Sequence, residues 1–244
     1  MKNLNKAVMD SKEFKDINSG REVFYNFLSR SFKTEVNEEY LEMLFSLMPY
    51  IDNITAQSDI EQLKKGGELL KECVENLRHL TVNEKQEVLL DLARDFTYIF
   101  IVGTKFVPTS ESVYLSPEHL VKQEPRDMVM KVYRETGFSV SKNFNEPEDH
   151  IALEFEFIAN LSRLVCRAVD DNDKDKVSEY LKCQKNFIEE HLNKWIPQFC
   201  SFLMRSAEDR VFYKALAYLT EGFLIVDYEF IKEATRPQNL WVDL

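Results

Sequence analysis

Apolar side chains recur every three or four residues along most of the chain, which is the spacing of one face of an α-helix. Only 6 glycines and 7 prolines interrupt its 244 residues, and so few chain breakers favour long helices over short strands joined by tight turns. The predicted helices include residues 23–32, 41–48, 61–77, 84–102, 125–137, 147–169, 176–191 and 212–230, with one more that starts at 197. The sequence therefore predicts an all-α fold, a single globular bundle-like domain of about nine or ten helices.

Local signals predict where several of these helices begin and end. Two stretches, Ser58–Glu61 and Ser206–Asp209, match the pattern of a helix-capping sequence. Pro125 fits a first helical turn, and Gly137 fits the left-handed position that follows a last turn. Because proline lacks the backbone N–H that a helix interior needs, we expect Pro197 to begin a new helix.

The helical pattern stops between residues 103 and 124. This stretch contains serines and prolines, with apolar side chains such as Tyr114 embedded among them. A connection of this length inside a compact domain is more often functional than idle. It divides the predicted domain, residues 1–244, into an N-terminal half (1–102) and a C-terminal half (125–244).

The stretch EPEDHIALEFEFIANL, residues 146–161, alternates like a strand over its middle, but the alternation does not continue to its end. A helix accounts for the whole stretch, because steps of about 100° per residue separate its polar and apolar sides. Asn145 and Glu148 can form a capping pair, and Pro147 fits the first turn. We therefore expect a helix over 147–169.

Two acidic side chains and a histidine at the start of this helix carry its candidate chemistry. Glu154 projects on the apolar side, where an unpaired carboxylate is costly, and His150 lies one turn before it. Asp149 lies in the first turn, where we expect it to face outward and accept a cationic partner. In one interpretation Asp149 helps to cap the helix and His150 pairs with Glu154 as a structural contact. In the other, the three residues hold a metal in a helical metal-binding protein or metal-dependent enzyme.

Charge and composition exclude some classes of protein. The formal net charge of −11, from 31 Lys and Arg against 42 Asp and Glu, argues against a nucleic-acid binder and suits a cationic partner. No apolar stretch is long enough to span a bilayer, and no secretion signal opens the chain, so we expect a cytoplasmic protein.

Sequence motifs for enzymatic chemistry are missing. The four cysteines form no CxxC pair and are expected to be reduced thiols. No GxSxG, HExxH or phosphate-binding glycine loop is present, and no catalytic residue, cofactor or resident metal is predicted. The acidic run 171–175 resembles the start of a calcium loop but lacks its glycine and its last glutamate, so we interpret it as a turn between helices.

Four motifs occur in order along the chain: Phe96–Gly103 (FTYIFIVG), Glu111–Leu115 (ESVYL), Glu146–His150 (EPEDH) and His191–Phe199 (HLNKWIPQF). Together they resemble the TorD/DmsD family of cytoplasmic chaperones for molybdopterin oxidoreductases. The stretch EPEDH is similar to the family's EPxDH signature. Phe96 stands where the family usually has a tyrosine, and the residues just before Glu111 also depart from its pattern.

The resemblance implies an all-α chaperone that binds the twin-arginine signal peptide of a partner enzyme and holds back its export until the cofactor is loaded. It associates the Asp and His of the signature with leader binding, and an ionised carboxylate can accept two hydrogen bonds from one guanidinium. The predicted signal-peptide site comprises Glu146, Pro147, Asp149, His150, Ser112 and Tyr114, with Glu154 behind it.

The resemblance also sets expectations for partners. We expect the catalytic subunit of a molybdopterin oxidoreductase, and neither nucleic acid nor stable membrane insertion. Weak guanine-nucleotide binding is implied by some members of the family. We expect a monomer, because short connections favour exchange of elements between protomers and the connection 103–124 is long. A domain-swapped dimer is the alternative.

Overall fold

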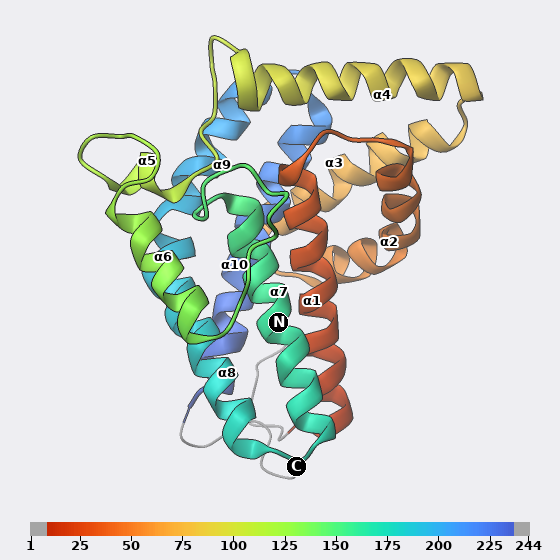
Figure 1. The fold of residues 1–244 in the computed structure, drawn as a ribbon. Coiled ribbons are helices and arrows are strands. Elements are labelled where there is room, and N and C mark those ends of the chain that lie inside the picture. The colour runs from red at the N-terminus through yellow and green to blue at the C-terminus, as the bar shows by residue number, and fades with distance from the viewer. Residues whose placement is uncertain (1–8, 237–244) are drawn as a thin grey trace. The chain divides into compact units, whose positions relative to one another are not determined.

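The structure is a computed structural model, and it describes residues 9–236. These residues form ten α-helices and two short π-helical segments and contain no β-strand, so the all-α prediction is confirmed (Figure 1). The elements are α1 (Ser11–Lys33), α2 (Glu38–Gln57), α3 (Glu61–Arg78), α4 (Val82–Thr97), η1 (Tyr98–Val102), α5 (Glu111–Leu115), α6 (Glu124–Glu135), α7 (Ile151–Asp170), α8 (Lys174–Phe187), η2 (Ile188–Leu192), α9 (Asn193–Ala207) and α10 (Val211–Ala234).

These elements form two compact units. Within the described residues, the first unit consists of 31–109 and 196–225, and the second of 9–30, 110–195 and 226–236. Each unit therefore draws on both sides of the 103–124 segment, and α1, α9 and α10 contribute residues to both. That segment also contains the short helix α5, which the sequence pattern did not predict.

An aromatic cluster forms part of the core of the first unit. Phe100 lies 5.0 Å from Phe96 and 5.8 Å from Tyr213, measured between ring centroids, and Phe32 lies 5.3 Å from Phe199. Most of these pairs are edge-to-face or tilted, the arrangements that aromatic rings prefer. All five rings are buried, so α1, α4, η1, α9 and α10 are held together in this unit by aromatic packing.

Two glycines allow α3 and α10 to approach closely in the first unit. A Cβ atom added at Gly66 would lie 2.6 Å from the backbone nitrogen of Leu219, and one added at Gly222 would lie 2.4 Å from that of Leu63. Both distances are shorter than any relaxed carbon–nitrogen contact. The crossing of these two helices therefore requires residues without a side chain.

A buried ion pair joins α1 to α10 in the second unit. Arg21 donates from Nε to Asp227 Oδ1 at 2.5 Å and from Nη2 to Oδ2 at 3.0 Å. Tyr25 donates its hydroxyl to the same carboxylate at 2.7 Å, and Asn18 accepts from Arg21 Nη1 at 2.9 Å. Burying two charges is tolerated here because the carboxylate and the guanidinium satisfy each other with several hydrogen bonds.

Two predicted helix ends are confirmed. Pro125 lies in the first turn of α6, and Gly137 follows that helix with a φ of 71°, a conformation that suits glycine. The acidic run does form a turn, between α7 and α8, and Asp173 caps α8 by accepting a hydrogen bond from the Lys176 amide at 3.0 Å.

Other predicted helix ends are wrong. Ser58 does not cap a helix through Glu61, because α3 has Ile60 at its N-cap and Ser58 Oγ accepts from the Ile60 amide instead. Pro197 lies inside α9 rather than at the start of a helix. The stretch 206–209 spans the end of α9 and the turn before α10.

The helix predicted over 147–169 begins four residues later than expected. The helix α7 spans Ile151–Asp170, with His150 as its N-cap. Asn145, Pro147 and Glu148 precede the helix, so they form neither its capping pair nor its first turn. This shift decides where the side chains of the EPEDH stretch point.

Candidate functional site

A histidine caps the N-terminus of α7. His150 has extended backbone angles (φ −74°, ψ 137°), and its Nδ1 accepts a hydrogen bond from the Ala152 amide at 3.1 Å. Histidine is not among the usual N-cap residues, which are Ser, Thr, Asp and Asn. The contact requires the tautomer in which Nδ1 carries no proton, so this ring acts as an acceptor at the helix start.

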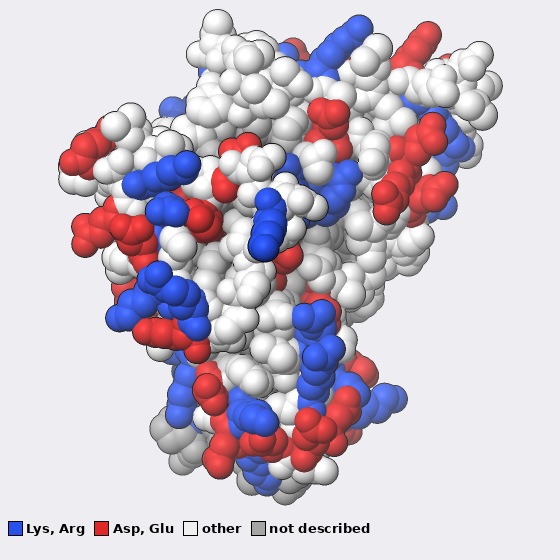
Figure 2. All heavy atoms as spheres, viewed as in Figure 1, with Lys and Arg blue, Asp and Glu red and all other residues white. Residues whose placement is uncertain are grey.

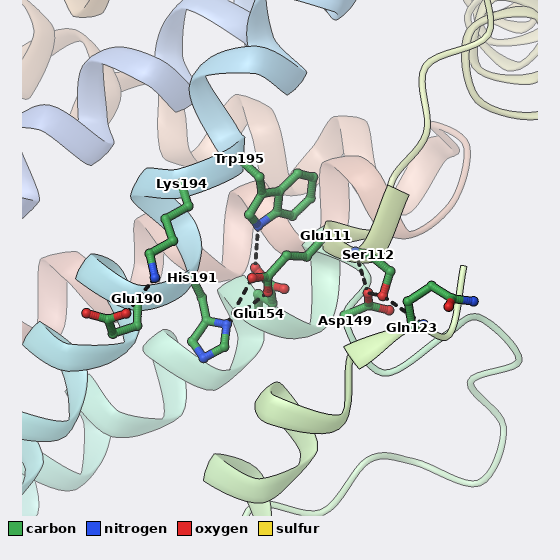
Figure 3. A network of polar contacts seen from close by, with 9 residues as sticks. All are labelled: Glu111, Ser112, Gln123, Asp149, Glu154, Glu190, His191, Lys194 and Trp195. Carbon is green, nitrogen blue, oxygen red and sulfur yellow. Dashed lines mark hydrogen bonds and ion pairs between the residues drawn. The ribbon is translucent and has the colours of Figure 1, made fainter. Parts of the chain in front are cut away.

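Asp149 points into the protein rather than outward, and the prediction of an exposed Asp149 is wrong. Its Oδ2 accepts hydrogen bonds from the Ser112 amide at 2.7 Å and the Ser112 hydroxyl at 2.5 Å (Figure 3). Its backbone carbonyl accepts from the Glu111 amide at 3.0 Å. The Asp149 side chain is fully buried, and among the described residues its Oδ1 has no hydrogen-bond partner.

These contacts attach α5 to the stretch that precedes α7. Ser110 and His150 form an isolated antiparallel bridge, so the two segments also pair through their backbones. Ser112 Oγ in turn accepts from the Gln123 amide at 3.2 Å, which ties in the chain just before α6. Burial raises the pKa of Asp149, and the hydrogen bonds from Ser112 oppose that rise.

A second group of buried polar side chains lies beside the first. Glu154 Oε2 accepts from Trp195 Nε1 at 3.0 Å, and the carboxylate of Glu111 contacts His191 Nδ1 at 3.0 and 3.1 Å (Figure 3). The partner of Glu154 is therefore Trp195, and the predicted pair of His150 with Glu154 is wrong. All four side chains are buried.

Glu154 is a buried carboxyl group that favours its protonated form. Burial is the main cause, and the nearby carboxylate of Glu111 adds to it, so the pKa of Glu154 lies well above its usual value. Its Oε1 has no partner among the described residues. Because an unpaired buried charge is expensive, we assign a neutral carboxyl group to Glu154, next to a Glu111 that faces His191.

The remaining predicted site residues have different environments. Tyr114 is buried, with its ring centroid 5.2 Å from that of Trp195, so it belongs to the core. Pro147 is buried, and Glu146 is exposed. The neighbouring Glu148 is partly buried and pairs with Arg126 Nε at 2.5 Å.

Three members of this group were missed by the sequence analysis as site residues. In the sequence, Glu111 appears only within ESVYL, and His191 and Trp195, four residues apart, appear only within HLNKWIPQF. That four-residue spacing was the available signal, because it places both side chains on one side of a helix. Their carboxylate partners come from α5 and α7, which no local pattern connects.

Within residues 9–236, no group of three or more His, Cys, Asp or Glu side chains is arranged to hold a metal ion. Asp149, His150 and Glu154 each use a side-chain atom for a different contact: a serine, a helix start and a tryptophan. In the same described part of the chain, no helix has the length and apolar character that crossing a membrane requires.

The second unit also contains two hollows. A polar cleft of about 320 Å³ lies between α1, α7 and the turn after α6, and its lining includes Glu22 and Glu156. A larger groove of about 530 Å³ runs between α6 and α8, and it is mainly apolar. His191 lines this groove, so the buried polar group reaches the wall of the α6–α8 groove.

Comparison with known proteins identifies the family. A family model described as "Nitrate reductase delta subunit" matches residues 61–201. "Chaperone protein TorD" of Photobacterium profundum is 31% identical over 166 residues, which cover 66% of this chain and 74% of the relative. The proteins of the same name from Vibrio parahaemolyticus and Shewanella sp. (strain MR-4) are 25% and 28% identical, and each alignment covers 90% of this chain and 98% or 97% of the relative. The chain therefore belongs to the nitrate reductase delta subunit family, together with the TorD chaperones.

Proposed function

We propose that this chain is a cytoplasmic maturation chaperone for a molybdopterin oxidoreductase. It binds the twin-arginine signal peptide at the N-terminus of that enzyme's catalytic subunit and holds it until the cofactor has been inserted. Membership of the family supports the chaperone role, and so do curated TorD chaperones that align over nearly their full length. The net charge of −11 suits an arginine-bearing partner.

The contact of Asp149 with Ser112 is the observation that carries this proposal. It joins the EPEDH and ESVYL motifs, the two stretches that supply the predicted peptide-site residues. Because Asp149 is buried, we assign it a positioning role: it holds α5 against the entrance of α7, with His150 closing that entrance. Glu146, which is exposed, is the carboxylate that an arginine of the peptide can reach. Pro147 and Tyr114 are buried, so we assign them a packing role beneath this surface.

Peptide binding tests the proposal directly. A fluorescent peptide with the twin-arginine leader is titrated with the protein, and the dissociation constant is read from fluorescence anisotropy. We expect Glu146→Gln to weaken binding by about threefold to tenfold, as loss of one exposed charge-assisted contact does. Ser112→Ala should also weaken binding, because α5 loses one of its attachments to Asp149.

The control is Glu75→Gln, which removes an exposed carboxylate from α3 in the first unit and should leave affinity unchanged. A peptide with two alanines in place of the arginines should bind at least tenfold more weakly. If the wild-type protein does not bind the leader, or binds both peptides equally, the proposed function is wrong.

A further inference from the structure

The α6–α8 groove is the larger of the two hollows described in the second unit, at about 530 Å³. Its apolar floor is formed by Met128 and Val132 of α6 and by Cys183 and Phe187 of α8. These residues lie four apart on each helix, so each helix offers one apolar stripe to the groove. The two helices are in contact, because the ring centroids of Tyr133 and Phe187 lie 6.2 Å apart.

The dimensions of the groove fit a short helix. Its lining on α8 and η2 runs from Glu179 to His191, and twelve steps of 1.5 Å along a helix rise about 18 Å. A partner segment of about three helical turns has the same length. Met128 is 46% exposed, and methionine and cysteine adapt their shape to different apolar partners.

The charged side chains that line the groove are three glutamates, Glu135, Glu179 and Glu190, and two lysines, Lys131 and Lys182. Glu135 and Glu179 both line it, and both lie close enough to the Cys183 thiol to add to the effect of burial, which raises the pKa of that thiol to about 11. Lys131 reaches Glu135 only at 3.9 Å, and this exposed pair contributes little. Met128 lies two helical turns from Glu135, so the apolar floor extends away from Glu135.

We propose that the α6–α8 groove binds a helical segment with about three turns of apolar residues preceded by arginines or lysines. One basic residue lies beside Glu135 and Glu179, a second remains available to Glu146, and the apolar residues cover Met128, Val132 and Phe187. This inference rests on the proposed function, because a basic stretch followed by 7–15 apolar residues is the design of a signal peptide. It assigns the apolar part of the leader to a surface outside the EPEDH stretch.

His191 connects this groove to the α5 segment. It lines the groove and contacts the carboxylate of Glu111, and Glu111 is followed directly by Ser112, which Asp149 holds. A peptide that covers His191 therefore contacts the side chain that holds Glu111 of α5. The groove and the EPEDH stretch can thus bind two parts of one leader.

Cross-linking locates the bound peptide. The probe is a synthetic peptide with two arginines followed by twelve leucines and alanines, with a photoreactive residue at the centre of the apolar part. After irradiation with the full chain, mass spectrometry should find the cross-links within residues 128–135 and 179–191. Cross-links confined to other segments, such as the walls of the polar cleft between α1 and α7, would overturn the inference.

Substitutions test the same surface by affinity. Met128→Glu places a charge on the apolar floor at a position that is already half exposed, and we expect at least tenfold weaker binding. Val23→Glu is the matched control, because Val23 is 38% exposed on α1 in the same unit and lies outside the groove. Circular dichroism and the urea midpoint establish that both variants are folded.

Charge reversal tests the orientation. The pair Glu135→Lys and Glu179→Lys should weaken binding of the arginine peptide and leave a peptide without basic residues unaffected. The pair Glu72→Lys and Glu75→Lys on α3 changes the net charge equally and should have little effect.

Two negative outcomes are distinct. If the wild-type chain does not bind the leader at all, the proposed function fails. If it binds the leader but Met128→Glu binds equally well, only the placement in this groove fails.

Discussion

Three carboxyl groups, those of Glu111, Asp149 and Glu154, are buried at the candidate site, although burial usually removes charges from such groups. Each has a specific donor: His191, Ser112 and Trp195, respectively. The donors come from three different elements. The carboxyl groups therefore act as cross-links between segments, and the protonation states of Asp149 and Glu154 contribute to the stability of the second unit.

The raised pKa of Glu154 predicts a pH dependence of stability. A carboxyl group whose pKa is higher in the folded state binds a proton more tightly there, so it stabilises the fold at low pH. This contribution is lost as pH rises from about 4.5, the usual value, through the folded-state pKa. The slope is at most about 1.4 kcal/mol per pH unit for one group.

Glu154→Gln tests this sign, because glutamine keeps an oxygen for Trp195 but cannot ionise. The free energy of unfolding in urea, measured at intervals from pH 5 to 8, should fall less steeply in Glu154→Gln than in the wild type. The raised pKa of Asp149 acts in the same direction in both proteins, so the difference between the two slopes reports on Glu154 together with its electrostatic interaction with Asp149. Parallel curves for the two proteins would show that Glu154 is ionised in the folded state.

Substitution of Asp149 should destabilise the fold rather than only reduce binding. Asp149→Ala leaves the Ser112 amide without its acceptor in a buried site, and we expect a loss of about 2 kcal/mol in the free energy of unfolding. Ser112→Ala removes only the hydroxyl contacts and should lose about 1 kcal/mol. Urea unfolding checks both values. Equal losses would mean that the amide contact contributes nothing.

The orientation of these side chains could not be predicted from local sequence. The helical period correctly placed Glu154 on the buried side, but the start of the helix was set at residue 147 because Pro147 and Glu148 match a helix entrance. The actual N-cap is His150, which lies outside the usual capping residues. Because the helix begins four residues later than predicted, Asp149 lies in the stretch before it. There it accepts a hydrogen bond from Ser112, which is 37 residues away in the sequence.

At the scale of elements, the helical period predicted most of the helices but not their irregular turns. The helix expected over 84–102 is α4 followed by η1, and the one expected over 176–191 is α8 followed by η2. Such π-helical turns are rare and occur mostly as single turns within α-helices, so a period of three or four residues does not distinguish them from α-helix. Pro197 is the fifth residue of α9, and the π-helical turn η2 directly precedes this helix.

The crossing of α3 and α10 predicts a strong effect of a single methyl group. Gly66→Ala would place a Cβ atom 2.6 Å from the Leu219 backbone, which cannot move aside as a flexible side chain can. We expect the free energy of unfolding to fall by about 2 kcal/mol. Glu68→Ala, an exposed position on the same helix, should change it by less than about 0.5 kcal/mol. Similar midpoints for the two variants would show that the helices separate at little cost.

At the scale of the molecule, the net charge of −11 is not gathered into one acidic surface on the face that Figure 2 shows, where basic and acidic groups are interspersed. The all-α class followed from periodicity and from the scarcity of glycine and proline. The composition of the two units could not be predicted, because segments such as 31–109 and 196–225 are joined only by contacts between distant residues.

The charge predicts how binding depends on salt. Attraction between an acidic protein and an arginine-bearing peptide acts over about 10 Å at 0.1 M salt and is screened above that concentration. We expect the association rate of the twin-arginine peptide, measured by stopped-flow fluorescence, to fall by about tenfold between 20 mM and 500 mM NaCl. The dissociation rate should change much less. A salt-independent association rate would show that apolar contacts alone guide the encounter.

The turn η2 has a consequence for the lengths that homologous chains can adopt. Phe187, His191 and Trp195 are spaced by four residues, and in an unbroken α-helix each step of four overshoots a full turn by about 40°. A π-helical turn contains more residues than an α-helical turn, which offsets this rotation. The ring centroids of Phe187 and His191 therefore lie 4.7 Å apart while Trp195 still donates to Glu154. Deleting one residue here would rotate everything after it by about 100°. Insertions and deletions among relatives should therefore spare the eight-residue interval from Phe187 to Trp195.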